Sequence, residues 1–556
     1  MGHRVVSRDF IDHDTKVNFD ARASVHSVDD EETKTHPALG STVQLFESEQ
    51  APDDRRWQSG IRERLVFICI IILAMMDAFN ATVMIPVLPH LANTFQAPLV
   101  TTLWVNTAYL ALNAASQLFF PMLCEVFSHG PVWIIAVVFA TIGTGICSGS
   151  MTLSELIVGR LVQGLGAGGS TSLCFVVMAE SSPEPIHARY SSYILLTRML
   201  GAILGPIVGG LFVDNAHWTW AFYFNFIFCA LGLLAIPFAV DLRFSKNIPL
   251  RKLRILDWSG ATMVPMGAGG IILGLSWGGV YFRWLQWESL APIAVGVAGF
   301  VALAFYESFW ALHPLFCRRV FRSCAMVMTY VGCFLHGFLV FCQLQFFALY
   351  FMSTKYLTPT VSGTTLLAIN GLAMAPAAVV GIVLAHEMQY LHWIISSGWM
   401  LTLLAAGCAI LLNSTTPTVG WVFLFFSAGL GHGLLFASYN IRIWNAPKDE
   451  AASWPTKPAT ISLLIRGWGM AAALPIGGVV FLTFLAAELD KIGLQRDLIN
   501  TANGYLILMN DVQMDHGQRE TIKAATAVAF RVVWELLAGV AALGGISSVF
   551  LWKKGR

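Results

Sequence analysis

The sequence has few charged residues for its length. Only 12 % of its 556 residues are Asp, Glu, Lys or Arg, whereas 56 % are hydrophobic, and the mean hydropathy is +0.65. This composition excludes a soluble protein and indicates a chain with many membrane-spanning segments. The formal net charge of +1, with basic residues at the flanks of apolar runs, gives no basis for nucleic acid as a partner.

Motifs of enzymes and of ATP-driven pumps are also missing. The chain has no phosphate-binding loop of the Walker type, and His386-Glu387 lacks the second histidine of a zinc-binding helix. Gly274–Gly278 fits the G-x-S-x-G pattern of hydrolases, but it ends an apolar run instead of joining a strand to a helix. The ten cysteines lack metal-ligand spacing. We therefore expect no catalysis, no cofactor and no metal site, and any work must draw on a gradient.

Apolar runs dominate the chain after an N-terminal tail. Residues 1–60 are rich in Asp, Glu, Ser and Thr and show no cleavable signal peptide, which predicts a disordered cytosolic tail. Fourteen later runs have about the 20 residues that a bilayer core requires, and the chain is therefore predicted to be an all-α polytopic membrane protein. The runs cover residues 66–88, 101–122, 131–149, 153–178, 190–213, 218–240, 258–277, 289–309, 324–347, 361–385, 391–411, 418–441, 460–486 and 524–551.

Basic residues are distributed unequally between the loops. With the tail in the cytosol, the cytosolic flanks hold twenty Lys and Arg residues and the outer loops hold six. The positive-inside rule then places both termini in the cytosol. The same orientation puts the sequon at Asn413 outside, which makes Asn413 a predicted glycosylation site.

The fifth run contains a helix face with almost no side chains. Gly201, Gly205 and Gly209 recur at every fourth residue, and Pro206 removes a backbone donor beside them. In a membrane, such small residues let a neighbouring helix approach closely. Gly210 extends the same stretch. The run is therefore predicted to be a bent packing surface.

Part of this stretch recurs later in the chain. A shift of 268 positions carries Arg198, Gly201, Gly209 and Gly210 onto Arg466, Gly469, Gly477 and Gly478. Internal duplication is typical of transporters whose substrate site lies between the repeats. We therefore predict a six-helix bundle over residues 61–243, a linker with two inserted helices over 244–317, and a second six-helix bundle over 318–556.

One acidic residue, Asp77, lies in the middle of the first run. A carboxylate at that depth costs about 2.5 to 3.5 kcal/mol on insertion scales, so we expect it to face a cavity or a partner. Burial favours the protonated form of a carboxylate and a nearby cation favours the charged form. Alternation between these settings can carry protons across a membrane, and Asp77 is therefore a predicted proton-coupling residue.

Polar side chains also follow single faces of other runs. Such a stripe on an apolar helix faces either water and substrate or a hydrogen-bonding neighbour helix. We favour a substrate cavity for the stripes of the second and fourth runs. The predicted cavity residues are Asn80, Asn106, Tyr109, Asn113, Gln117, Gln163, His336, Gln343 and His432.

Four segments together resemble the major facilitator superfamily, in its fourteen-span drug:proton antiporter branch, and more narrowly fungal efflux carriers for secondary metabolites. Gly201–Gly210 resembles the antiporter motif of the fifth helix, and Asp77–Pro89 resembles the first-helix motif. Gly159–Gly166 resembles the fourth-helix motif, and Trp218–Asn225 the opening of the sixth helix. The resemblance implies two six-helix bundles plus two inserted helices, and it implies that Arg160 forms a proton-coupling pair with Asp77.

The loop between the second and third runs departs from the family pattern. Family members have roughly the sequence G-x-L-x-D-R-x-G-R-R in this loop. The corresponding residues of this chain are Pro121–Gly130, with Glu125 in the acidic position and His129 in place of an arginine. In the family this loop stabilises the outward-facing state through charge pairs and a helix dipole. Gating through Glu125 and His129 is therefore predicted to differ from the family.

From the resemblance we expect a proton-coupled antiporter that exports a small amphipathic organic compound, such as a secondary metabolite, toxin or drug, by alternating access. Its expected partners are this compound, protons and the bilayer, and it is expected to act as a single chain, with the plasma membrane favoured over vacuolar or vesicular membranes. Two alternatives remain open. One is a proton-coupled uptake symporter for a nutrient or metal chelate, and the other is a non-transporting membrane sensor or scaffold.

Overall fold

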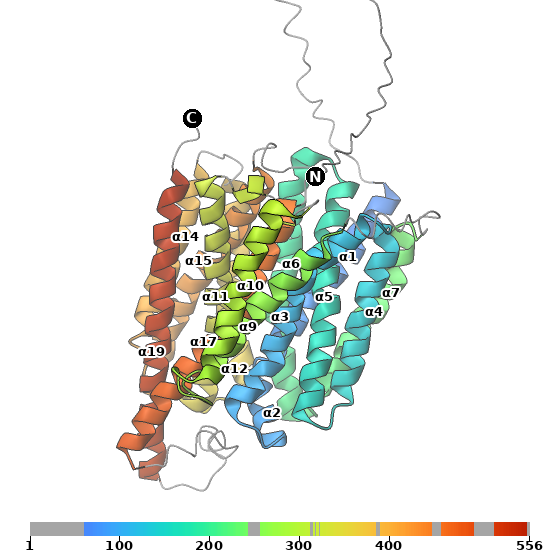
Figure 1. The fold of residues 1–556 in the computed structure, drawn as a ribbon. Coiled ribbons are helices and arrows are strands. Elements are labelled where there is room, and N and C mark those ends of the chain that lie inside the picture. Colours follow the sequence, from blue (N-terminus) through green and yellow to red (C-terminus); the bar gives the residue numbers. More distant parts are fainter. Residues whose placement is uncertain are drawn as a thin grey trace, which may run out of the picture. The chain divides into compact units, whose positions relative to one another are not determined.

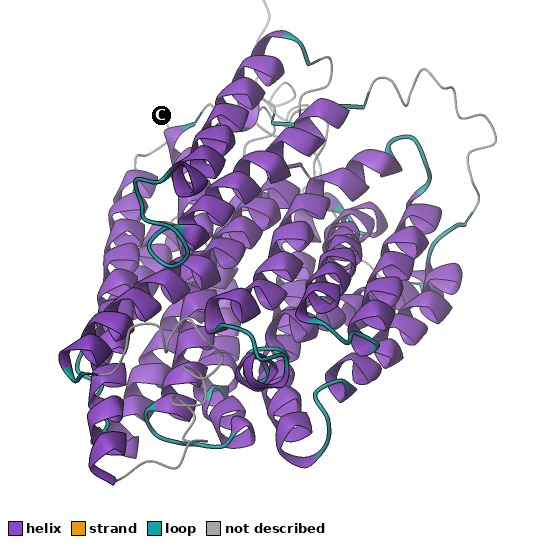
Figure 2. Cartoon of the chain, turned by 60° about the horizontal axis from the view of Figure 1, so that its bottom comes forward, coloured by secondary structure: helices purple, strands orange, loops and turns teal. Residues whose placement is uncertain are grey.

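A computed structural model describes residues 60–242, 256–311, 315–316, 318–321, 323–384, 390–446, 457–493 and 516–552. Residues 1–59 of the predicted tail lie outside the described residues, as do the basic flank from Arg243 to Arg254 and part of the last outer loop. The described residues form helices joined by loops (Figure 2), with one isolated bridge between Gly278 and Phe282. The predicted all-α class is confirmed.

Long helices run side by side through the described chain (Figure 1). The first half contains α1 (Ile61–Thr82), the short α2 (Leu88–Thr94), α3 (Leu99–Cys124), α4 (His129–Ser148), α5 (Leu153–Ser181), α6 (His187–Asn215) and α7 (Trp220–Ala239). The inserted pair is α9 (Trp258–Trp277) and α10 (Trp287–Phe309). The second half contains α11 (Cys324–Ser353), α12 (Pro359–Thr365), α13 (Ala375–Leu384), α14 (Leu391–Ala409), α15 (Thr418–Trp444), α17 (Lys457–Lys491) and α19 (His516–Val549).

Twelve helices of the described part are long and apolar enough to cross a membrane. The second predicted run corresponds to α3, which has 26 residues but a polar stripe that lowers its hydropathy. The tenth corresponds to α12 and α13, which are joined through a π-helical turn, η3 (Ala368–Met374). With these two segments, the described helices account for all fourteen predicted runs.

The two halves make corresponding contacts. Helix α6 packs on α1 and α17 packs on α11, while α6 also meets α12 and α17 also meets α3 across the halves. A Cβ atom on Gly201 would collide with the backbone of Met75 in α1, and one on Gly469 with the backbone of Phe334 in α11. The bare glycine faces therefore set both close helix contacts, as small residues do in membranes.

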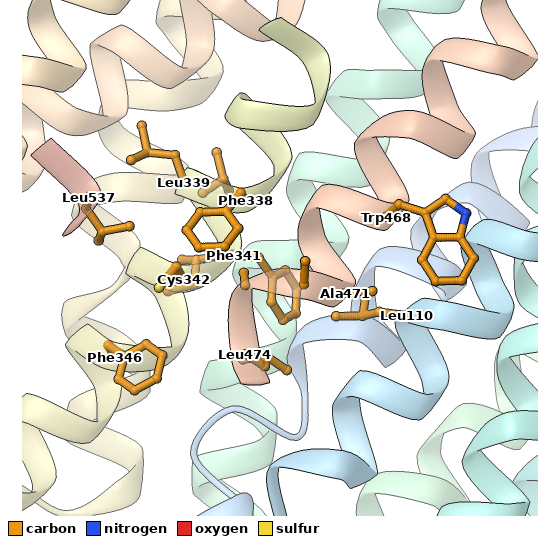
Figure 3. Close-up of a cluster of buried hydrophobic side chains, with 14 of the residues drawn as sticks. Leu110, Phe338, Leu339, Phe341, Cys342, Phe346, Trp468, Ala471, Leu474 and Leu537 are labelled. Atoms are coloured by element: carbon orange, nitrogen blue, oxygen red, sulfur yellow. The ribbon is translucent and has the colours of Figure 1, made fainter. Parts of the chain in front are cut away.

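Apolar side chains from both halves pack against each other. Figure 3 shows Leu110 of α3 near Trp468 and Ala471 of α17, with Phe341 of α11 beside them. The inserted helices α9 and α10 pack on each other and contact α17 and α3 through α9. Only 17 % of the most apolar window of α10 is buried, so this helix presents most of its surface outward.

Candidate functional site

A cavity lies between the two halves, with an empty volume of about 910 Å³ that includes space open to solvent. Helices α1, α3 and α6 line it from the first half, and α11, α15 and α17 line it from the second. Most of its lining is apolar, as in sites for amphipathic ligands. The polar and charged exceptions are Asp77, Thr82, Tyr109, Asn113, Gln117, Arg198, His336 and Arg466.

Asp77 is buried at this cavity and is held by three side chains. The Tyr109 hydroxyl donates to its Oδ1 at 2.8 Å, and the Asn113 amide donates to the same oxygen. Arg198 of α6 forms an ion pair with its Oδ2. Because a buried carboxylate needs both a counter-charge and hydrogen bonds, this arrangement explains how a charge can lie here.

Arg198 reaches Asp77 because the glycine face brings α6 close to α1. It lies one turn before Gly201 on the same helix, and its Nη1 also donates to the Thr171 hydroxyl at 3.1 Å. In the sequence, Arg198 stands out only as part of the internal repeat. The signal that could have found it is its i, i+3 spacing from Gly201, which puts it on the face that meets α1.

Arg160 lies in a separate network behind Tyr109. It is fully buried, and its guanidinium lies 4.1 Å from the centre of the Tyr109 ring. Its hydrogen bonds go to neutral acceptors: Asn106 Oδ1 at 2.7 Å, Gln163 Oε1 at 2.7 Å, the Asn80 carbonyl at 3.0 Å and the Val105 carbonyl at 3.3 Å. The structure therefore brings Arg198, and not Arg160, to the carboxylate of Asp77. Tyr109 connects the two groups.

The other predicted cavity residues divide into two sets. Tyr109, Asn113, Gln117 and His336 line the cavity. The remaining five form hydrogen bonds between helices, which is the alternative that polar stripes leave open. Besides the network of Arg160, Asn80 donates to Asn225 at 2.8 Å, Asn106 donates to the Ala81 carbonyl at 3.0 Å, Gln163 donates to Thr144 at 2.9 Å, and His432 bonds Gln343 at 2.6 Å.

The predicted antiporter motif is a contact surface on two sides. Cβ atoms on Gly205 and Gly209 would collide with Thr82 and Val83 of the first transmembrane segment. Gly210 instead meets the Pro359 carbonyl of α12, and the carbonyl of Pro206 faces Gly363. Helix α6 therefore packs against its own half through one set of glycines and against the other half through the next.

Both ends of α6 are bonded to the second half. At its start, the Asn440 amide of α15 donates to the hydroxyls of Ser191 at 2.8 Å and Ser192 at 3.0 Å. At its far end, the Thr360 amide of α12 donates to Asp214 Oδ2 at 2.8 Å. The cavity lies between these two contacts, because Arg198 and Met199 of α6 line it.

An ion-pair contact lies beside the loop that departs from the family pattern. The Nε2 of His129, at the start of α4, lies 3.0 Å from Oε1 of Glu180 near the end of α5. Glu125 is the exposed residue that follows α3. This contact joins the start of α4 to the end of α5, and it is an ion pair when the His129 ring is protonated.

The predicted glycosylation site lies in the exposed loop between α14 and α15. The Asn413 side chain accepts hydrogen bonds from the amide and hydroxyl of Thr415 at 3.0 and 2.9 Å. Lys355 joins this loop to the one after α11 by donating to the carbonyls of Ser414 and Thr416. Burial, followed by the charge of Lys523, lowers the pKa of the Lys355 ammonium.

Comparison with known proteins gives consistent matches. The family model described as Major Facilitator Superfamily matches residues 70–453. "MFS transporter L2" of Phoma sp. is 27 % identical over 511 residues, covering 91 % of this chain and 84 % of the relative. "MFS efflux transporter aclA" of Aspergillus oryzae is 27 % identical over 493 residues, covering 87 % and 88 %.

Solved structures show the same fold. A bacterial homologue of the human lysosomal transporter Spinster, in an inward-facing and unoccupied conformation, aligns with a TM-score of 0.60 at 14 % identity, covering 89 % of this chain and 99 % of that one. A peptide transporter, POT, in complex with sulfate aligns with a TM-score of 0.53 at 16 % identity, covering 87 % and 95 %.

Proposed function

Because the chain belongs to the Major Facilitator Superfamily, a family of membrane transporters that are not enzymes, we propose that it exports a small amphipathic organic compound from the cytosol in exchange for protons. Its fungal relatives include proteins named as efflux transporters, which supports the outward direction. The observation that carries the proposal is the Asp77–Arg198 ion pair at the wall of a cavity between the two halves. We place this exporter, as a single chain, in the plasma membrane.

Proton coupling follows from what protonation does to this ion pair. A proton on Asp77 removes the negative charge that holds Arg198, and what remains is a hydrogen bond from the guanidinium to a neutral carboxyl group, without the ion pair. The pair joins α1 to α6, and α6 is the helix bonded to the second half at both ends. Protonation of Asp77 therefore changes the relative free energies of conformations that differ in the contacts of α6. Proton coupling requires such a change.

Alternating access requires the two cross-half contacts of α6 to open one at a time. Opening at the Asn440 end would connect the cavity with the predicted cytosolic side, and opening at the Asp214 end would connect it with the outside. The Asn440 side chain supplies the hydrogen bonds of one contact, and the Thr360 amide supplies one hydrogen bond to the other beside the close packing of α6 on α12. Each such hydrogen bond is worth about 0.5–1.5 kcal/mol. Protonation or cargo binding can therefore shift the equilibrium between the open and closed forms of each contact.

The lining of the cavity supports an amphipathic cargo. Leu110, Phe341 and Phe436 offer apolar contact, while Gln117 and Asn113 offer amide groups. The Oε1 of Gln117 has no hydrogen-bond partner among the residues that the structure describes. A cargo with apolar rings and a few polar groups would satisfy both kinds of lining.

Deletion of the gene followed by metabolite profiling tests the direction of transport. An exporter predicts that one organic compound rises inside the cells and falls in the medium, whereas an uptake symporter predicts the opposite. The identified compound is then given to proteoliposomes. Antiport predicts accumulation in vesicles that are acidic inside, and symport predicts accumulation in vesicles that are alkaline inside, whichever way the protein is inserted. Absence of saturable flux would leave only the sensor or scaffold.

A further inference from the structure

The Asp77–Arg198 pair has a counterpart in the second half. Gly201 of α6 packs on Met75, and Gly469 of α17 packs on Phe334 in the corresponding way. Two residues after Met75 comes Asp77, and two residues after Phe334 comes His336. Three residues before the glycines stand Arg198 and Arg466. The second half therefore keeps the arginine but replaces the acidic partner with a histidine.

Arg466 has no acidic partner among the described residues. Arg466 is more than nine-tenths buried, and its Nε has no hydrogen-bond partner in the part of the chain that the structure describes. Its Nη2 makes only a long contact of 3.7 Å with the Cys333 sulfur. The His336 ring beside it is fully buried, and neither of its nitrogens has a hydrogen-bond partner within the described ranges. Leaving a buried arginine uncompensated in this way is costly, so such a residue in a membrane indicates a function.

Both residues face the central cavity. The Arg466 guanidinium lies 4.4 Å from the centre of the Phe436 ring, and the His336 ring lies 5.2 Å from the same ring. All three line the cavity, together with the Asp77–Arg198 pair. The described lining thus contains two arginines and one aspartate, and this aspartate is already neutralised by Arg198. The positive charge that remains is that of Arg466.

We propose that Arg466 binds an acidic group of the cargo, with His336 as a neighbouring hydrogen-bond donor. The substrate class is then an amphipathic organic acid, whose carboxylate or similar oxyanion takes the place that Asp77 occupies in the first half. A guanidinium matches a carboxylate through two parallel hydrogen bonds, and Phe436 holds the guanidinium plane by stacking. This inference rests on the proposed export function, because it names the compound class for the same cavity.

The test compares two probes of the same shape, 1-pyrenebutyrate and its neutral amide 1-pyrenebutyramide. The full-length protein in nanodiscs is titrated at pH 7.5 without a gradient, and energy transfer from tryptophan to pyrene reports binding after subtraction of empty nanodiscs. The wild-type protein should bind the acid at least about tenfold more tightly than the amide, as expected for one charge-assisted contact. Arg466→Gln should abolish this preference, because it weakens binding of the acid much more than binding of the amide.

Two further variants distinguish a binding role from a structural one. Arg466→Lys keeps the charge and should retain part of the preference, whereas Arg531→Gln changes an exposed arginine that pairs with Glu535 and should leave it intact. Equal binding of the two probes by the wild type, absence of acid binding, or an Arg466→Gln variant with full preference would overturn the proposal. An Arg466-dependent preference in a protein that shows no gradient-driven flux would support this site while contradicting the export function.

Discussion

Asp77 and Arg198 form an ion pair across the contact between α1 and α6, with side chains 2 % and 16 % exposed. The pair lies where the glycine face of α6 allows the two helix backbones to approach. Its strength therefore depends on the carboxylate, the guanidinium and the small residues that position them. Each of these three dependences can be tested separately.

Removal of the positive charge of Arg198 should be more harmful than replacement of its guanidinium by an ammonium group. Arg198→Gln leaves Asp77 buried without a counter-charge, which costs about 3–5 kcal/mol, whereas Arg198→Lys keeps a cation. We expect Arg198→Gln to lower the melting temperature in detergent and to abolish gradient-driven flux, while Arg198→Lys retains partial flux. Arg531→Gln, at an exposed ion pair, is the control and should change neither quantity. Unchanged stability of Arg198→Gln would argue against the ion pair.

A methyl group in the glycine face should separate α6 from α1. A Cβ on Gly205 would collide with the Thr82 hydroxyl and the Val83 amide, and overpacking of this kind costs about 1–3 kcal/mol. We expect Gly205→Ala to lower both the melting temperature and the transport rate. The matched control is Gly407→Ala in α14, where no atom lies within 4 Å of the new Cβ. Equal effects of the two substitutions would contradict the packing role.

The two cross-half contacts of α6 should control opposite openings. Asn440→Ala removes the bonds to Ser191 and Ser192, and Asp214→Ala removes the bond from Thr360. We expect Asn440→Ala to speed hydrogen exchange of backbone amides at the start of α6 and at the end of α15. Asp214→Ala should instead speed exchange in α12. Faster exchange at the same end in both variants would exclude separate gates.

The sequence predicted the helices well because their lengths follow from the thickness of the bilayer. The polar stripe of α3 was also predicted, and three of its four residues, Tyr109, Asn113 and Gln117, line the cavity. In the second half, however, Gln343 and His432 bond each other instead of facing the cavity. Helical spacing places a residue on a face of a helix, but it does not say which neighbour that face meets.

The partner of Asp77 could not be predicted from the family pattern. The resemblance pointed to Arg160, which instead donates to neutral oxygens and stacks on Tyr109. The contact with Arg198 depends on how closely α6 approaches α1, and that distance is set by three-dimensional packing of glycines. For the same reason the sequence does not show that Arg466 has no acidic partner among the described residues.

Proton counting on Asp77→Asn tests the central claim most directly. The purified protein is reconstituted with a trapped pH indicator, and the compound identified by metabolite profiling is added while proton and compound fluxes are recorded together. Asp77→Asn should retain measurable binding of the compound but lose both compound-induced proton movement and pH-driven accumulation. Glu488→Gln, at an ion pair with the exposed Lys491, should behave as the wild type. Full pH-driven accumulation by Asp77→Asn would contradict the account.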